Sequence, residues 1–178
     1  MDEQTTVIAG IVIPSVSPVF LSIVAVHIVI ALTAVVSGVV AMLSQKGAGQ
    51  HVRFGTIYFW SLFGVFVSAT VLSFMRWPEN RHLFIIGMAA FSLALIARTA
   101  ARARWRQWAR IHLIAMGLSY VALLVAFYVD NGPNLPIWRD LPPFLYWLLP
   151  MIIGIPLIVR ALLRHPLTRI AHGNSIRG

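Results

Sequence analysis

The stretch that decides the fold is VFLSIVAVHIVIALTAVVSGVVAML, from Val19 to Leu43, which contains no Asp, Glu, Lys or Arg. A helix needs about 20 predominantly apolar residues to cross the hydrocarbon core of a bilayer. In that core every backbone amide must find its partner inside the protein, and a helix provides one for each residue. The stretch therefore predicts a transmembrane helix, with the histidine His27 inside it.

Four further apolar stretches of spanning length follow, over residues 52–74, 81–100, 109–129 and 144–163. The composition agrees, because 59% of the residues are hydrophobic and only 11% are charged. A soluble domain averages about 45–50% apolar and about 25% charged residues, so lipid must be the main solvent of this chain. We therefore predict an all-α integral membrane protein, a single membrane domain over residues 1–178 with five transmembrane helices.

The chain start and the fifth span differ from this pattern. The apolar run Val7–Ile13 ends at Pro14 and is too brief to span, so we expect a surface or re-entrant segment there. The start, MDEQTT, is acidic, unlike a secretory signal, so no cleaved signal peptide is expected. The fifth span contains Pro150 and Pro156, which should bend it, and it has no histidine. We therefore place it beside a core formed by the other four helices.

Charged residues predict the orientation, because cytoplasmic loops carry an excess of Lys and Arg. The links after the first and third spans and the tail are basic, whereas the other ends hold every carboxylate of the chain. This alternation predicts an N-terminus outside and a cytoplasmic tail over residues 164–178. The carboxylates are Asp2, Glu3, Glu79, Asp130 and Asp140.

The link RARWRQWAR, from Arg102 to Arg110, interleaves basic and aromatic residues, as nucleic-acid-binding surfaces do. A positive cytoplasmic loop with Trp105 and Trp108 at the membrane interface explains the same residues. We therefore expect no nucleic-acid partner. The expected partner is the lipid bilayer, and contact with anionic lipid is an additional role.

Several kinds of chemistry are excluded by what the sequence lacks. All five carboxylates lie outside the spans, which argues against a proton or cation pathway, and no two share a helix face. Cysteine is absent, so disulfides, thiolate metal sites and cysteine nucleophiles are excluded. No nucleophile–base pair, phosphate-binding loop or H-E-x-x-H pattern is present. We therefore assign no catalytic residue.

Four histidines lie in or at the spans, at alternating levels. His27 and His82 belong to the outer half, from spans one and three, whereas His51 and His112 share the cytoplasmic level, from spans two and four. In a bundle wound in sequence order, spans one and three are diagonal partners, as are two and four. Diagonal histidines in a four-helix core are able to hold a flat macrocycle between them. This layout predicts two sites for haem b, with the four histidines as iron ligands.

Haem also needs small residues beside its ligands. Gly38 lies on the face of His27, and Gly55 lies four residues after His51. Tyr58 and Tyr120 lie about two turns after a histidine and are candidates to hydrogen-bond a haem propionate or a quinone. Small residues that let helices approach, and tyrosines satisfied inside a bundle, are the alternative explanation.

The levels of the outer pair do not match, because His82 is shallower than His27. A third span that begins earlier, near Pro78, would lower His82 by about one turn, roughly 5 Å. Binding of another metal, a polar network and purely structural roles therefore stay open for the four histidines. His165 and His172 belong to the tail, where solvated surface residues are expected.

Three strings together resemble a family of uncharacterised bacterial membrane proteins, from about His27 onward: KGAGQHVRFGTIYFW, RIHLIAMGLSYVALLVAFYVDNG and LPPFLYWLLPMIIGIPLIVRALL. This resemblance implies a small polytopic helical protein and brings no established activity. The histidine layout is similar to that of two-haem transmembrane cytochromes b, which pass electrons from ascorbate or a quinol. It implies the ligand pairs His27 with His82 and His51 with His112. The short first link and the lack of a donor-binding motif depart from that pattern.

The sequence thus favours a multi-pass b-type cytochrome that carries electrons across the membrane from a quinol or another donor. The alternative is a non-catalytic accessory subunit of a larger membrane complex, for which the small size and the lack of acids within the spans argue. A third reading is a carrier of lipid or a small molecule that uses the fifth helix.

Overall fold

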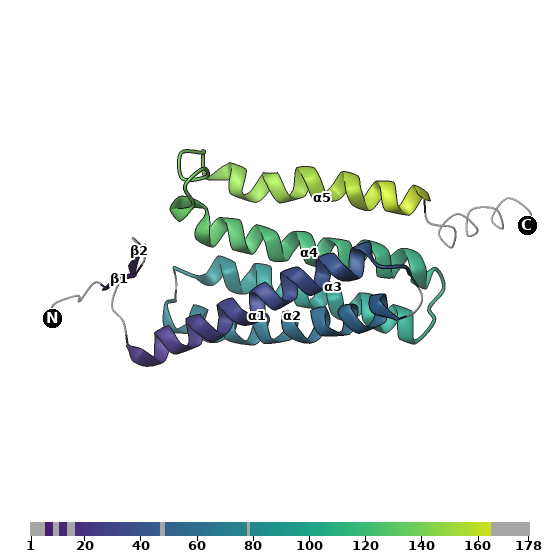
Figure 1. Cartoon of the computed structure of the whole chain (residues 1–178), viewed down its shortest axis with the longest axis horizontal. Coiled ribbons are helices and arrows are strands. Elements are labelled where there is room, and N and C mark those ends of the chain that lie inside the picture. The colour runs from purple at the N-terminus through teal and green to yellow at the C-terminus, as the bar shows by residue number, and fades with distance from the viewer. Residues whose placement is uncertain (1–5, 9–10, 14–16, 47–48, 78, 165–178) are drawn as a thin grey trace, which may run out of the picture. The chain divides into compact units, whose positions relative to one another are not determined.

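A computed structural model of the chain describes residues 6–8, 11–13, 17–46, 49–77 and 79–164 (Figure 1). Within these ranges five long helices follow one another along the chain. They are α1 (Pro18–Leu43), α2 (Gln50–Met75), α3 (Arg81–Arg102), α4 (Trp108–Asn131) and α5 (Phe144–Arg164). A short 3-10 turn, η1 (Gly132–Asn134), follows α4.

All five helices are long and apolar enough to cross a membrane, and they are the only such helices among the described residues. Their bounds match the predicted spans to within two residues at every end, which confirms the predicted fold class. Pro150 and Pro156 lie inside α5, as predicted for the fifth span. The tail, with His165 and His172, lies outside the described residues.

The described chain divides into two compact units. The first runs up to Phe84 and includes Asn134–Arg139, and the second comprises Ile85–Pro133 and the residues from Asp140 onward. Each unit is described by itself below. The single domain and the four-helix core with its diagonal pairs concern both units together, and they stay predictions.

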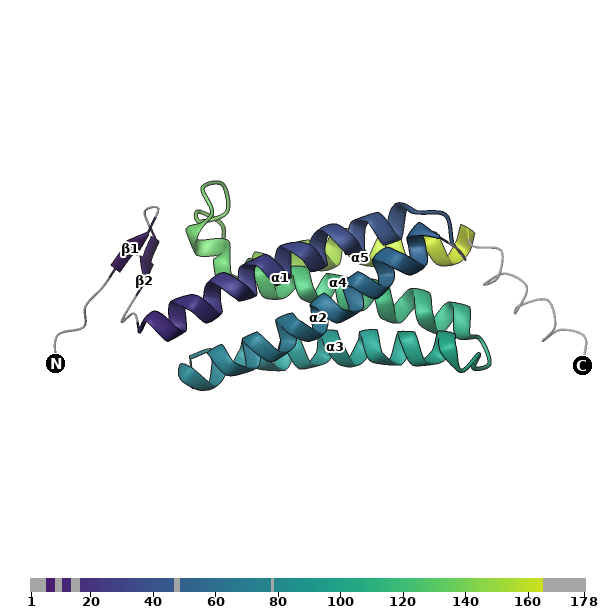
Figure 2. The same ribbon diagram turned by 60° about the horizontal axis from the view of Figure 1, so that its bottom comes forward.

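In the first unit, α1 and α2 form an antiparallel pair (Figure 2). The side-chain hydroxyl of Ser17 accepts a hydrogen bond from the amide of Phe20 at 3.1 Å, and proline follows at the first position of α1. The buried residues of α1 are all small, which lets the neighbouring helix approach closely. They are Ala34, Ser37, Gly38 and Ala41.

The first unit also contains a short β-hairpin before α1. Strand β1 (Thr6–Ile8) pairs antiparallel with β2 (Ile11–Ile13), and Val7 lies opposite Val12. The sequence predicted a surface or re-entrant segment here and did not anticipate the strand pairing. The β-branched residues of both strands are those that favour extended backbone.

In the second unit, α4 and α5 pack through glycines. A side-chain carbon added at Gly117 would come within 2.6 Å of Ile158, and one added at Gly154 would overlap Val121. These contacts run in opposite directions along the two helices, so the helices are antiparallel. Small residues at both contacts allow the backbones to approach, as is common between membrane helices.

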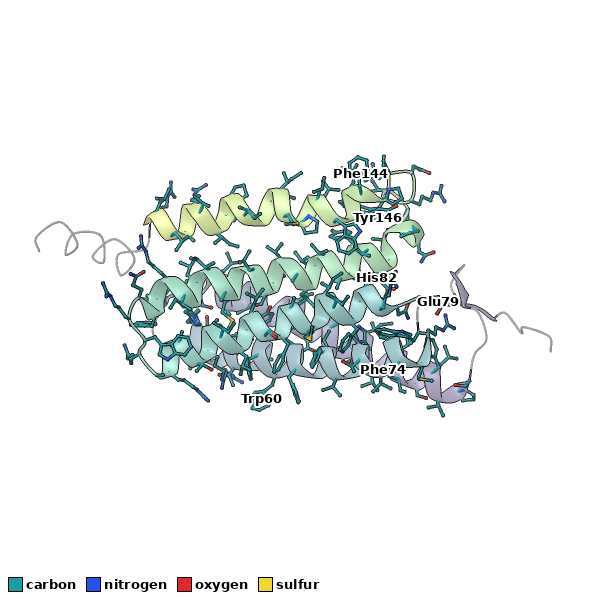
Figure 3. All side chains as sticks on the ribbon, turned by 180° about the vertical axis from the view of Figure 1, so that it is seen from behind. Trp60, Phe74, Glu79, His82, Phe144 and Tyr146 are labelled. Atoms are coloured by element: carbon teal, nitrogen blue, oxygen red, sulfur yellow. The ribbon has the colours of Figure 1, made fainter. Side chains whose placement is uncertain are left out.

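The connection between α4 and α5 is held by Tyr146, which is only 4% exposed. Its ring lies against Gly132, where an added side-chain carbon would be 2.7 Å away. Its hydroxyl donates a hydrogen bond to the carbonyl of Leu141 at 3.3 Å. Figure 3 shows Tyr146 and Phe144 at the beginning of α5. These contacts fix the ends of the long link against the helices that it joins.

Candidate functional site

His51 is the second residue of α2, and its ring is oriented by the end of α1. Nδ1 of His51 lies 2.8 Å from the carbonyl oxygen of Ala41. A carbonyl oxygen only accepts hydrogen bonds, so Nδ1 must carry the proton. In this tautomer Nε2 holds the lone pair, which is the form of histidine that binds a metal ion.

His112 is oriented in the same way in the second unit. Its Nδ1 lies 3.1 Å from the carbonyl oxygen of Ala97, near the end of α3. Nδ1 is therefore again the donor, and Nε2 holds the lone pair. His51 and His112 thus each lie near the start of one helix and donate to a carbonyl near the end of the preceding helix.

His27 lies inside α1, and its partner is a side chain of α2. Its Nδ1 is 2.8 Å from Oγ of Ser68. The hydroxyl of Ser68 donates its own proton to the carbonyl of Gly64 at 2.7 Å. The hydroxyl of Ser68 is therefore within hydrogen-bond distance of both the imidazole of His27 and the carbonyl of Gly64. Two of the four candidate ligands, His51 and His112, share one tautomer.

His82 is the second residue of α3, which begins at Arg81. Pro78 lies outside the described residues, and Glu79 and Asn80 form a turn. The helix therefore does not begin early enough to lower His82 by one turn, and the predicted offset from His27 stays a prediction. Figure 3 shows His82 and Glu79 at the same end of the first unit as Phe74.

An aromatic cluster surrounds the end of α2 beside His82. The ring of Phe84 lies 5.9 Å from that of Phe74 and 6.4 Å from that of Trp77, measured between ring centroids. Phe74 and Trp77 stack on one another at 5.7 Å. Phe74 and Trp77 are both at least half exposed, which suits an aromatic belt at the membrane interface.

The pairing of the histidines is only partly described. His51 belongs to the first unit and His112 to the second, so the predicted inner pair spans both units. His27 and His82 belong to the first unit. Among the described residues no group of three or more His, Cys, Asp or Glu side chains is placed to hold a metal ion.

The predicted small residues fall into two groups. Gly38 is buried in the contact between α1 and α2. At Gly55, by contrast, an added side-chain carbon would meet nothing within 4 Å. A glycine inside a helix lowers the stability of the helix by about 1 kcal/mol relative to alanine. No close contact with a neighbouring residue explains the glycine at position 55. The face of α2 that carries His51 therefore has open space one turn further on.

The predicted tyrosines differ in burial. Tyr58 is 4% exposed and belongs to the interior of the first unit. Tyr120 is partly buried on α4. The position of Tyr58 fits a side chain within the helix contact, and its role toward a cofactor stays a prediction.

Lys46 lies beside His51 at the end of α1. Its ammonium group donates hydrogen bonds to the carbonyls of Ala41, at 3.2 Å, and Met42. Partial burial lowers the pKa of Lys46 below its ordinary value. Ala41 thus accepts from both Lys46 and His51, so cationic and imidazole donors together satisfy the last turn of α1.

Sequence reasoning did not identify Ser68 or the acceptor carbonyls of Ala41 and Ala97. The available signal for Ser68 was its position as a polar residue within a spanning helix. Backbone carbonyls carry no signal in a sequence, because every residue has one.

No family model, no curated protein sequence and no solved structure matches this chain. The resemblance to uncharacterised bacterial membrane proteins therefore stays an expectation.

Proposed function

We propose that this protein is a transmembrane b-type cytochrome, in which His27 and His82 hold one haem and His51 and His112 hold another. When bound, haem supplies a one-electron couple whose potential depends on its axial ligands and their surroundings. The donor on one face, a quinol or another reductant, would lose an electron, and an acceptor on the other face would gain it. The protein would act in a bacterial inner membrane.

The observation that carries the proposal is the shared tautomer of His51 and His112. Each donates from Nδ1 to a backbone carbonyl near the end of the preceding helix, and Nδ1 of His27 lies 2.8 Å from Oγ of Ser68. Histidines that bind metals usually donate their other ring N–H to such an acceptor, which fixes the ring and raises the basicity of the ligating nitrogen. The chain therefore supplies two imidazoles whose rings are oriented by backbone carbonyls.

The open face at Gly55 supports the same proposal. A porphyrin beside His51 needs space along α2, and an added side-chain carbon at Gly55 would meet no atom within 4 Å. The helix backbone exposes no competing polar group there, because its amides are bonded within the helix.

The test is the visible absorption spectrum of the full chain, purified from cells with ample haem, before and after reduction. We expect the bands of six-coordinate b-type haem and about two haems per chain by pyridine extraction. A colourless protein without extractable haem would contradict the proposal. If that protein co-purifies with a large membrane complex in mild detergent, the accessory-subunit reading replaces the cytochrome.

Asparagine substitutions separate the ligand from its structural bond. In His51→Asn the side-chain amide keeps a donor near the position of Nδ1, but no nitrogen remains at the position of Nε2. We expect His51→Asn and His112→Asn each to lose the same haem, with the other haem retained. In the haem-free protein, each variant should lose less than half of the stability that is lost when the donor is removed altogether.

A further inference from the structure

The turn between α3 and α4 concentrates guanidinium groups in the second unit. We name residues 98–110 the arginine turn; its arginines at 102, 104 and 106 are exposed, whereas those at 98 and 110 are partly buried. The sequence contains no Asp or Glu between Glu79 and Asp130. The helices α3 and α4 therefore bring no carboxylate to this end, and the positive charge is not balanced by its own elements.

The backbone of this turn is ordered and departs from local preferences. The amide of Trp105 donates to the carbonyl of Ala100 at 3.2 Å, and Arg104 between them has a φ of 52°. This is the Schellman ending of a helix, whose left-handed position is usually glycine. Gln107, which precedes α4, also has a positive φ, of 63°.

An arginine in the left-handed region is strained where glycine would not be. Departures of this kind are expected where the side chain serves a purpose other than stability. The strain at Arg104 is therefore evidence that its guanidinium group is used.

Tryptophans place the arginine turn at a membrane surface. The helices on both sides, α3 and α4, are long and apolar enough to span. Trp105 is 44% exposed, and the guanidinium carbon of Arg104 lies 5.0 Å from the ring centroid of Trp108. Tryptophan rings lie at the level of the lipid headgroups. The exposed arginines are therefore at the depth of the lipid phosphates.

We propose that the arginine turn is a binding surface for the headgroups of anionic phospholipids. Guanidinium groups present paired N–H donors that match phosphate oxygens, whereas the lysine ammonium acts as a point charge. All cations of the turn are arginines, and Lys46 is the one lysine of the chain. This surface does not depend on whether the chain binds haem.

The first experiment compares two variants that lose equal charge. The full chain is incubated with phosphatidylglycerol and phosphatidylcholine in detergent, and the retained lipid is measured by native mass spectrometry. Each cation near the surface contributes about 1 kcal/mol, or about fivefold in affinity. We expect R104Q/R106Q to weaken phosphatidylglycerol binding about 25-fold. The matched control is R81Q/R139Q, at exposed arginines of the ends that are predicted to lie on the other side of the membrane.

The control should retain phosphatidylglycerol as the natural chain does. Equal retention of both lipids by the natural chain would overturn the proposal. So would an equal loss in both double variants, because net charge alone would then account for the binding.

The second experiment uses Arg104→Gly, which separates binding from folding. Glycine relieves the left-handed backbone, so the unfolding temperature should rise, whereas phosphatidylglycerol binding should fall about fivefold. Arg104→Lys should keep part of the binding without the gain in stability. A glycine variant that binds phosphatidylglycerol as tightly as the natural chain would overturn the use of Arg104.

Discussion

The two ring nitrogens of His51, and likewise those of His112, differ in what they are able to do. Nδ1 stabilises the end of the preceding helix by donating to the carbonyl of Ala41 or Ala97. Nε2 is the nitrogen with the lone pair, on the opposite side of the ring. A substitution that preserves one nitrogen and removes the other therefore separates stability from ligand binding.

In the haem-free protein, loss of the Nδ1 donor of His112 should weaken the contact between α4 and α3. We expect His112→Leu to lower the free energy of unfolding of the haem-free protein by about 1 kcal/mol. His112→Asn, which keeps a donor near Nδ1, should lower it by less than half as much. Thermal unfolding in detergent measures both, and an asparagine variant as unstable as the leucine variant would exclude the bond as the cause.

If His27 holds a haem as proposed, Ser68 should tune it. Ser68→Ala removes the hydrogen-bond partner of Nδ1 of His27. Loss of such a partner typically costs 10–100-fold in metal-site affinity, so we expect about that loss in haem affinity. Ser68→Thr keeps the hydroxyl and is the matched control. Haem titration of the haem-free protein, with the midpoint potential of the outer haem as a second readout, tests this. If Ser68→Ala binds haem like the natural chain, Ser68 does not position the ligand.

The histidines could be predicted from the sequence, but their hydrogen bonds could not. Four histidines in or at the apolar segments can be read directly from the sequence. The acceptors at Ala41 and Ala97 are backbone groups, and they depend on how neighbouring helices are aligned along their axes. Ser68 was visible as a polar residue, but its facing of His27 depends on the same alignment.

Glycines decide how closely the helices pack. At Gly117 and Gly154 an added side-chain carbon would overlap the neighbouring helix, whereas at Gly55 it would meet nothing within 4 Å. The same residue type thus serves close packing at the first two positions and leaves open space at the third. Larger residues at Gly117 and Gly154 should therefore destabilise the protein, whereas a larger residue at Gly55 should stabilise the haem-free protein.

We expect Gly154→Val to destabilise the second unit by about 1–3 kcal/mol, because Val121 would have to shift. Gly55→Ala should stabilise the haem-free protein by up to about 1 kcal/mol, through helix propensity. Thermal unfolding of both variants tests the two signs together. Val121→Ala combined with Gly154→Val should restore part of the loss, and no recovery would show that the overlap lies elsewhere.

The helices were predictable from the sequence to within two residues at each end, because lipid requires long uninterrupted apolar runs. The hairpin of β1 and β2 was not, since three-residue strands carry too little periodicity to be distinguished from a loop. The glycines within the helices could also be read from the sequence. Whether a glycine allows close packing or leaves open space depends on which helix faces it.

Across the whole molecule, charge alternates between the ends of the five spanning helices. Arginines gather in the turn after α3, whereas the turn after α2 and the link after α4 contain acids. This distribution was readable from the sequence, and it underlies the predicted orientation. How the two units lie together depends on helix contacts that a single sequence does not encode visibly.

Single cysteines test the predicted orientation, because the chain has no cysteine of its own. We expect Asp140→Cys, in the link after α4, to react with a membrane-impermeant maleimide in intact spheroplasts. Gln45→Cys, in the link after α1, should react only after permeabilisation. Both positions are exposed, so equal labelling in permeabilised cells is the control. The reverse pattern would invert the predicted topology.

The hydrogen bond between His51 and Ala41 joins residues that are close in sequence, and it holds the beginning of α2 against the end of α1. His112 joins α4 to α3 in the same manner. Contacts of such short range form early, before distant parts of a chain meet. During synthesis His51 and His112 are therefore each able to bind their own helix to the preceding helix, as soon as both helices have left the translocon. Insertion would then proceed in pairs, and an error in a later helix would leave the earlier pair intact.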